Sequence, residues 1–250
     1  MLNTVRYLTL LEEDHRRLRA AGAADLAAPV PSCPGWTLAD LVDHVGEVYL
    51  HKAETMRLGA WPEPWPPEPD PAGPLHRLDR AYAELRAEFA AREPGEAALT
   101  WYDPDQTVGF WIRRMALETV VHRVDAELAA GTPVTPVPGD LAADGVDEIL
   151  TVMLAYETTT SAAEFGDALA EADGRPVSIA AGEERWLVRA TPAGVEVVRG
   201  EGASAAASVA GAPQDVLLWL WGRQDGAALT FGGDGTLVER LRRLLKESTQ

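Results

Sequence analysis

The side chains best suited to chemistry lie in one stretch of the sequence, residues 110–130. Glu118 and His122 are four residues apart, so at helical spacing both project from the same side of a helix. A carboxylate and an imidazole placed in this way can bind one metal ion together, or they can simply form a hydrogen bond with each other. Asp125, about one turn further on, adds a third polar group to the same face.

The rest of this stretch is apolar, which makes its polar groups unusual. One apolar stripe shares their face, and a second stripe, about a quarter-turn away, contains Phe110, Leu117, Val121, Val124 and Leu128. A helix with two such faces is expected to be buried, and burying a polar group without a partner costs roughly several kcal/mol. The sequence therefore predicts that a metal ion or other side chains satisfy these groups.

A third metal ligand is predicted at His44. Thr37 and Asp40 have the spacing of a helix N-cap and its capping box, which predicts a helix with His44 at the edge of its apolar stripe. An antiparallel pair of helices would bring His44 opposite Glu118 and His122. Three protein ligands and an open fourth position are typical of a catalytic zinc site. Taken alone, His44 fits a structural histidine better than a metal ligand.

The surrounding elements predict a helical bundle. Helical spacing of apolar residues indicates helices near residues 8–18, 38–52, 75–89, 110–130 and 146–153, joined mostly by short loops, as in an antiparallel bundle of four or five. Residues 59–74 are rich in proline and carry two tryptophans, so we expect a long loop there. Such a loop is either a functional lid or a solvated connector.

The sequence pattern changes after Asp173 from helical spacing to strand-like alternation, and a second domain is expected there. Short segments with β-branched alternation predict strands at 177–181, 185–190 and 195–200, with a further strand within 203–212. A helix over 213–223, a strand over 228–231 and a final helix capped by Asp234 follow. We therefore predict an α+β multidomain protein, with a four-helix bundle over residues 1–170 and a small α/β domain over residues 171–250.

The charge and composition of the chain disfavour some classes of binding partner. The formal charge is −17 over 250 residues, with a pI of about 4.6. Such an acidic surface disfavours nucleic acid and anionic membranes. Cys33 is the single cysteine, which fits a reducing compartment, and no apolar run is long enough to span a bilayer. We expect a cytoplasmic protein with small-molecule partners, either a monomer or a homodimer.

Two motifs resemble those of one family. The first is Val30–Thr37 followed by His44, and the second is Phe110–Met115 followed by Glu118, His122, Arg123, Asp125 and Ala126. Both are similar to the mycothiol-dependent maleylpyruvate isomerase family, and residues 204–233 are similar to its second domain. The resemblance implies a DinB-like four-helix bundle and a sterol-carrier-like C-terminal domain. It also implies a divalent metal, commonly zinc, whose ligands match His44, Glu118 and His122.

This resemblance implies an enzyme that uses mycothiol as a thiol cosubstrate. A metal-bound thiol is deprotonated at neutral pH and can add to a small electrophilic substrate, in an isomerase or an S-transferase. Asp125 and Arg223 are the predicted catalytic residues: Asp125 orients His122 or Arg123, and Arg223 holds a substrate carboxylate. Trp111, Arg113 and Arg114 are the predicted cofactor-binding residues.

Three alternatives stay open. The chain can be a non-catalytic protein that binds a metal or a small ligand, or a hydrolase that activates water at the same metal. Cys33 can itself be the nucleophile, but no histidine base is evident next to it.

Overall fold

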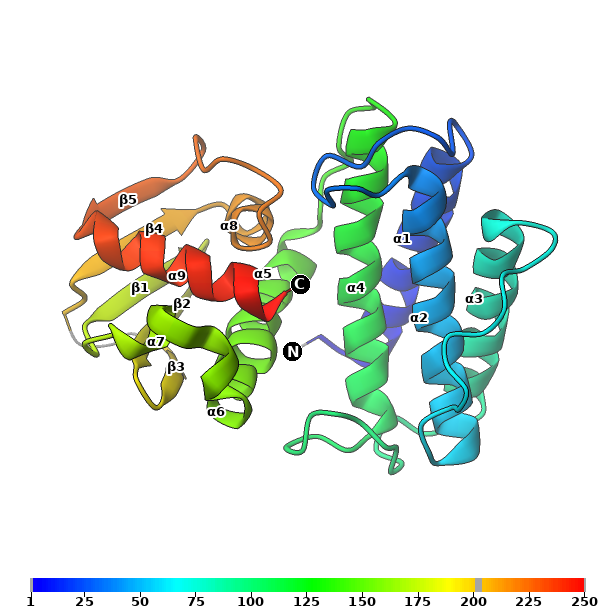
Figure 1. Ribbon diagram of the computed structural model, residues 1–250, viewed down its shortest axis with the longest axis horizontal. Coiled ribbons are helices and arrows are strands. Elements are labelled where there is room, and N and C mark those ends of the chain that lie inside the picture. The colour runs from blue at the N-terminus through cyan, green and yellow to red at the C-terminus, as the bar shows by residue number, and fades with distance from the viewer. Residues whose placement is uncertain (1, 201–203, 250) are drawn as a thin grey trace. The chain divides into compact units, whose positions relative to one another are not determined.

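The computed structural model describes residues 2–200 and 204–249 of the chain, which form two compact units, Leu2–Thr135 and Pro136–Gln250. In the described residues no helix is both long enough and apolar enough to cross a membrane. The first unit is a bundle of four long helices (Figure 1): α1 (Thr4–Gly22), α2 (Leu38–Leu58), α3 (Pro74–Ala90) and α4 (Val108–Ala129). The predicted four-helix bundle is therefore confirmed.

The helices of the bundle are not antiparallel throughout. Arg77 near the start of α3 pairs with Glu47 in the first half of α2, and Arg57 at the end of α2 pairs with Glu88 at the end of α3. Helices α2 and α3 therefore run in the same direction. The proline-rich loop over residues 59–73 is the crossover between them, and it must return along α2, whose 21 residues span about 30 Å. This geometry explains why the loop is long.

Helices α2 and α4 run in opposite directions, as predicted. His44 in the first half of α2 lies beside Glu118, and Lys52 further along α2 lies over the ring of Trp111 near the start of α4. Helix α2 begins with the predicted capping box, in which Thr37 and Asp40 satisfy each other's backbone N–H groups. These two helices bring the predicted ligands together.

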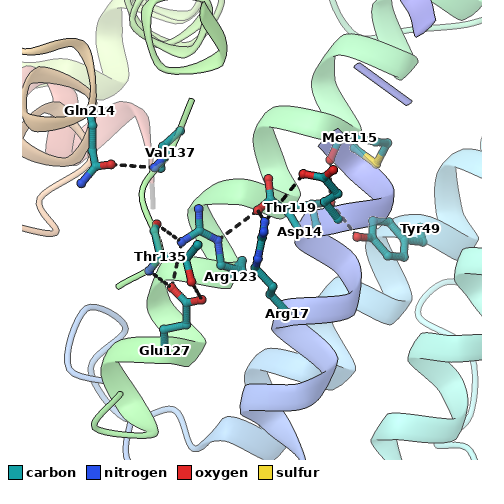
Figure 2. A network of polar contacts seen from close by, with 11 residues as sticks. Asp14, Arg17, Tyr49, Met115, Thr119, Arg123, Glu127, Thr135, Val137 and Gln214 are labelled. Atoms are coloured by element: carbon teal, nitrogen blue, oxygen red, sulfur yellow. Dashed lines mark hydrogen bonds and ion pairs between the residues drawn. The ribbon is translucent and has the colours of Figure 1, made fainter. Parts of the chain in front are cut away.

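A buried polar network fixes α4 against α1 (Figure 2). The fully buried Arg123 donates to Asp14 of α1 at 3.1 Å, and to Glu127 at 2.8 Å and the carbonyl oxygen of Thr135 at 2.6 Å. Tyr49 of α2 is hydrogen-bonded to Thr119 of α4 at 2.6 Å. Because these contacts fix particular sides of α4 to its neighbours, the helix is held in one rotation about its axis. Arg123 is therefore a structural residue.

The second unit contains a mixed five-stranded sheet in the order β3-β2-β1-β4-β5. Only the β1–β4 pair is parallel among these neighbours. The strands are β1 (Pro176–Ala181), β2 (Glu184–Thr191), β3 (Gly194–Arg199), β4 (Ala207–Gly211) and β5 (Thr230–Gly233). Helices α8 (Pro213–Leu220) and α9 (Gly235–Ser248) pack on the sheet, and Asp234 caps α9 as predicted. Of the strand predicted within 203–212, residue 203 lies outside the described residues.

The structure divides the chain between Thr135 and Pro136, whereas the sequence analysis placed the boundary at residue 170. Helix α5 (Gly139–Glu148), the π-helical segment Ile149–Tyr156 and the short helices α6 (Glu157–Thr160), Ala162–Phe165 and α7 (Gly166–Ala170) all belong to the second unit. The indole N–H of Trp186 on β2 donates to Asp147 at 2.9 Å, and the backbone N–H of Val195 on β3 donates to Thr158 at 3.0 Å. This helical stretch thus packs on the sheet of its own unit.

Candidate metal centre

His44, Glu118 and His122 meet between α2 and α4, as the sequence predicted. One carboxylate oxygen, Glu118 Oε1, lies 3.1 Å from His122 Nε2 and 3.5 Å from His44 Nε2. The three ligand atoms all lie within 4.8 Å of one another. The two imidazole rings are nearly perpendicular, with centroids 5.3 Å apart. Two nitrogens and one oxygen therefore converge on a single point, which is the donor set of a zinc-type site.

The loop before α2 helps to place His44. Trp36, just before the helix cap, packs against the His44 ring with centroids 5.0 Å apart. A surface hollow lined by Gly35, Trp36, Asp40, Asp43, His44 and Glu47 opens beside this ring. The His44 side chain is 35% exposed, whereas those of Glu118 and His122 are 13% and 12% exposed. Glu118 and His122 are thus held inside the bundle, and the site is open to solvent beside His44.

Asp125 holds His122 from behind. The Asp125 carboxylate is fully buried and lies 3.0 Å from His122 Nδ1, which leaves Nε2 facing Glu118. Ser32 in the loop before α2 donates to the other oxygen of Asp125. A carboxylate behind a metal-binding histidine fixes the tautomer and orientation of the ring. The role predicted for Asp125, orientation of His122, fits this geometry, and the loop residue Ser32 adds a support that had no recognisable signal in the sequence.

Arg114 holds the second oxygen of Glu118. The two residues are one turn apart on α4, and their side chains form a close ion pair. Burial by itself would raise the pKa of Glu118, but the charges of Arg114 and His122 outweigh it and hold the pKa well below its usual range. Glu118 is therefore an anion at neutral pH, with Oε1 directed to the histidines and Oε2 to Arg114.

The electrostatics of the site favour a bound cation. Burial would lower the pKa of His122, but the negative charges of Glu118 and Asp125 raise it to about 9. The same two carboxylates that retain a proton on this ring also favour a metal ion in the place of the proton. The donor types, their convergence and the support of His122 by Asp125 all fit a divalent metal such as zinc.

The other predicted site residues lie in different surroundings. Trp111 is fully buried, and its indole N–H donates to the carbonyl oxygen of Leu99 at 3.0 Å, so it is a core residue and has no surface for a thiol. Arg114 is 6% exposed and pairs with Glu118, and Arg113 is half-buried on the adjacent side of α4. Arg223, in the second unit, donates to the carbonyl oxygen of Trp221 at 2.6 Å and lies over the Trp221 ring.

Cys33 is close to the site without being one of its ligands. Its sulfur lies 3.9 Å from Asp125 Oδ2, the oxygen that also contacts His122 Nδ1, and Cys33 is not among the three residues whose ligand atoms converge. His51 is not part of the ligand set either; its ring contacts Trp61 and Trp65 of the crossover loop.

Fold and site together define a class of protein: a helical bundle that presents a His/Glu/His ligand set, followed by a mixed α/β unit. Two family models match nearly the whole chain. The model described as Mycothiol maleylpyruvate isomerase N-terminal domain matches residues 8–127, and the model described as MDMPI C-terminal domain matches residues 140–240. The chain belongs to the mycothiol-dependent maleylpyruvate isomerase family.

Solved structures agree with this fold. The crystal structure of the mycothiol-dependent maleylpyruvate isomerase has a TM-score of 0.62 and 14% sequence identity, over 92% of this chain and 93% of that one. A variant of that isomerase, with one histidine replaced by alanine, has a TM-score of 0.61 and 13% identity over the same shares of the two chains. Among curated proteins, none matches the chain.

Proposed function

We propose that this chain is a metal-dependent enzyme that uses a low-molecular-weight thiol, mycothiol, to isomerise or S-conjugate a small electrophilic substrate. The observation that carries the proposal is the convergence of His44, Glu118 and His122 within 4.8 Å, in a member of a family named for a mycothiol-dependent isomerase. A divalent metal bound there, zinc in our proposal, would lower the pKa of a coordinated thiol so that a thiolate is available at neutral pH.

The side chains of the chain itself have separate roles in this proposal. Glu118 and the two histidines would hold the metal, and the exposed edge of His44 is the side from which a thiol would reach it. Asp125 keeps His122 oriented, and Arg114 keeps Glu118 charged. Because Cys33 is the single cysteine and lies beside a carboxylate, we assign the nucleophilic thiol to the cosubstrate. This cysteine usage also supports a reducing compartment such as the cytoplasm.

A thiol titration of the cobalt-substituted protein tests this function. Addition of mycothiol, or of 2-mercaptoethanol as a simple probe, is expected to produce the charge-transfer absorption of a cobalt–thiolate bond in the wild-type protein. Glu118→Ala should not produce this band, whereas His51→Ala should, because His51 is outside the ligand set. A cobalt-loaded wild-type protein that never forms the band would exclude thiol activation and would favour a structural metal or a hydrolase.

A further inference from the structure

Lys52 is an unusual residue in this chain. The sequence has 20 arginines but only two lysines, Lys52 and Lys246. Lys246 is exposed on α9, whereas Lys52 is half-buried on α2, two turns beyond His44. The separation of these two α2 residues is about 12 Å along the helix axis, a distance that their side chains can shorten. Lys52 therefore lies further along the same contact between α2 and α4.

Among the residues that the structure describes, no carboxylate forms a close ion pair with the ammonium group of Lys52. Its Nζ atom lies 4.9 Å from the centre of the Trp111 ring and 3.2 Å from His51 Nδ1. Within the described part of the chain, no carboxylate lies within 4.0 Å of this atom. The buried cations Arg77 and Arg123 are each paired with two carboxylates. In a chain with 39 acidic residues, an unpaired ammonium at this depth is a site that an external anion can satisfy.

The charged side chains that lie near Lys52 leave its ammonium group available to bind an anion. Glu118 and Arg114 are close enough to influence the pKa of Lys52, but Glu118 is already shared by Arg114 and the two histidines. Burial lowers the pKa of Lys52 to about 8, so the group is still mostly charged at neutral pH. A metal at the ligand set would add positive charge nearby, and a negatively charged substrate is the natural complement.

Aromatic side chains shield this position from water. Trp111 lies beneath the ammonium, and the ring of His51 beside it is packed against Trp61 and Trp65 from the crossover loop, with centroids 5.6 and 4.8 Å away. An ion pair formed beside apolar rings is screened less than one in open water. The long loop therefore does more than join α2 to α3, because its tryptophans also form part of the surroundings of Lys52.

We propose that Lys52 is a carboxylate-binding residue of this site, and that it pairs with a carboxylate of an organic-acid substrate whose electrophilic carbon points toward the metal ligands. The proposal rests on the proposed function, since it assumes that a small substrate binds between α2 and α4. It assigns to Lys52 a role in substrate binding and selectivity for acids, separate from metal binding.

The test is calorimetric titration of succinate, a dicarboxylate that does not react with thiols, into the full chain. The protein is used both zinc-free and zinc-loaded, the latter saturated with 2-mercaptoethanol to keep succinate off the metal. Lys52→Met preserves the length of the side chain and removes its charge, and we expect it to weaken succinate binding at least about ten-fold. Lys52→Arg should stay within about three-fold of wild type, as should Lys246→Met, which makes the same charge change on α9. Dimethyl succinate, which is neutral, should not distinguish the four proteins.

A second readout follows the amine directly. Acetic anhydride acetylates both lysines, and mass spectrometry compares them; succinate should slow the modification of Lys52 and leave that of Lys246 unchanged. Failure of wild type to bind succinate, or equal binding by Lys52→Met with its fold and zinc content intact, overturns the proposal. If this occurs while the cobalt–thiolate band still forms, only the role of Lys52 is wrong. Succinate binding through Lys52 without any thiolate band would contradict the proposed function instead.

Discussion

His122 is held between two carboxylates of its own helix, with Nδ1 3.0 Å from Asp125 and Nε2 3.1 Å from Glu118. The side of the ring that faces Asp125 is buried, and the side that faces Glu118 is directed to His44. The two acids therefore differ in the roles that we propose for them: Glu118 is a metal ligand, and Asp125 orients the ligand His122.

The role of Asp125 predicts a graded loss of metal affinity. Asp125→Asn keeps the size of the side chain but removes the charge that fixes the tautomer of His122, so zinc should bind about 10- to 100-fold more weakly. Ser32→Ala removes a hydrogen bond to the same carboxylate and should have a smaller effect. Competition with a chromophoric chelator measures both affinities. Wild-type affinity in Asp125→Asn would show that the contact has no influence on the metal.

Cys33 should be dispensable for activity. Cys33→Ser is expected to retain turnover with added thiol and to lose at most some stability, because the residue is half-buried beside Asp125 and the reacting thiol is external. Withdrawal of the low-molecular-weight thiol should stop the reaction in both proteins. The assay compares wild type and Cys33→Ser, each with and without thiol. Thiol-independent activity that disappears in a folded, metal-loaded Cys33→Ser would make Cys33 the nucleophile.

Arg223 remains the predicted contact for a substrate anion from the second unit. Arg223→Lys keeps the positive charge but loses the planar fork that binds a carboxylate through two hydrogen bonds, so turnover should fall while zinc content stays normal. Arg185→Lys, the same change at the start of β2 in the same unit, is the control. If the steady-state kinetics of Arg223→Lys were indistinguishable from those of wild type, Arg223 would not bind the substrate, and its role would be limited to its contact with Trp221.

His15 makes the stability of the bundle sensitive to acid. Its ring is stacked on Tyr82 with centroids 3.7 Å apart, and its Nδ1 atom is buried without a hydrogen-bond partner. Burial lowers the pKa of His15 from 6.5 to about 4. The unfolded chain therefore binds a proton between pH 6.5 and 4 that the folded chain does not, and stability present above pH 6.5 is lost as the pH falls.

The loss from His15 should reach about 3 kcal/mol by pH 4. Urea unfolding of the zinc-free protein at a series of pH values measures it, with His15→Gln as the comparison. The variant is expected to be less stable at pH 7, and the difference should shrink on acidification. Two profiles that stay parallel from pH 7 to 4 would mean that His15 is not held neutral in the folded state.

The sequence predicted the convergence of His44, Glu118 and His122 because the signals for these residues are local. The capping pair Thr37 and Asp40 fixed the start of α2, and helical spacing placed Glu118 and His122 on one face. Only one assumption, that α2 and α4 run in opposite directions, was then needed to bring His44 to them. The support of Asp125 by Ser32 could not be predicted in this way, because it depends on how a loop 93 residues earlier folds back.

The errors have a common physical origin in packing between distant segments. Periodicity identified a helix near residues 146–153 but not its partner, which is the sheet to which Asp147 and Thr158 are hydrogen-bonded. The same limit applies to the parallel course of α2 and α3. Trp111, predicted to bind the cofactor, shares a helical stripe with Glu118 but lies two turns away and is fully buried.

The most direct test of the account is the zinc content of purified variants, because every proposed step depends on the ligand set. Wild type and His51→Ala should each carry about one zinc per chain after equilibration with zinc and removal of the excess. His122→Ala should carry almost none and Glu118→Ala nearly as little, because two remaining ligands hold zinc poorly. Circular dichroism verifies that each variant is folded. One zinc per chain in a folded His122→Ala would contradict the assignment of the metal centre to α4.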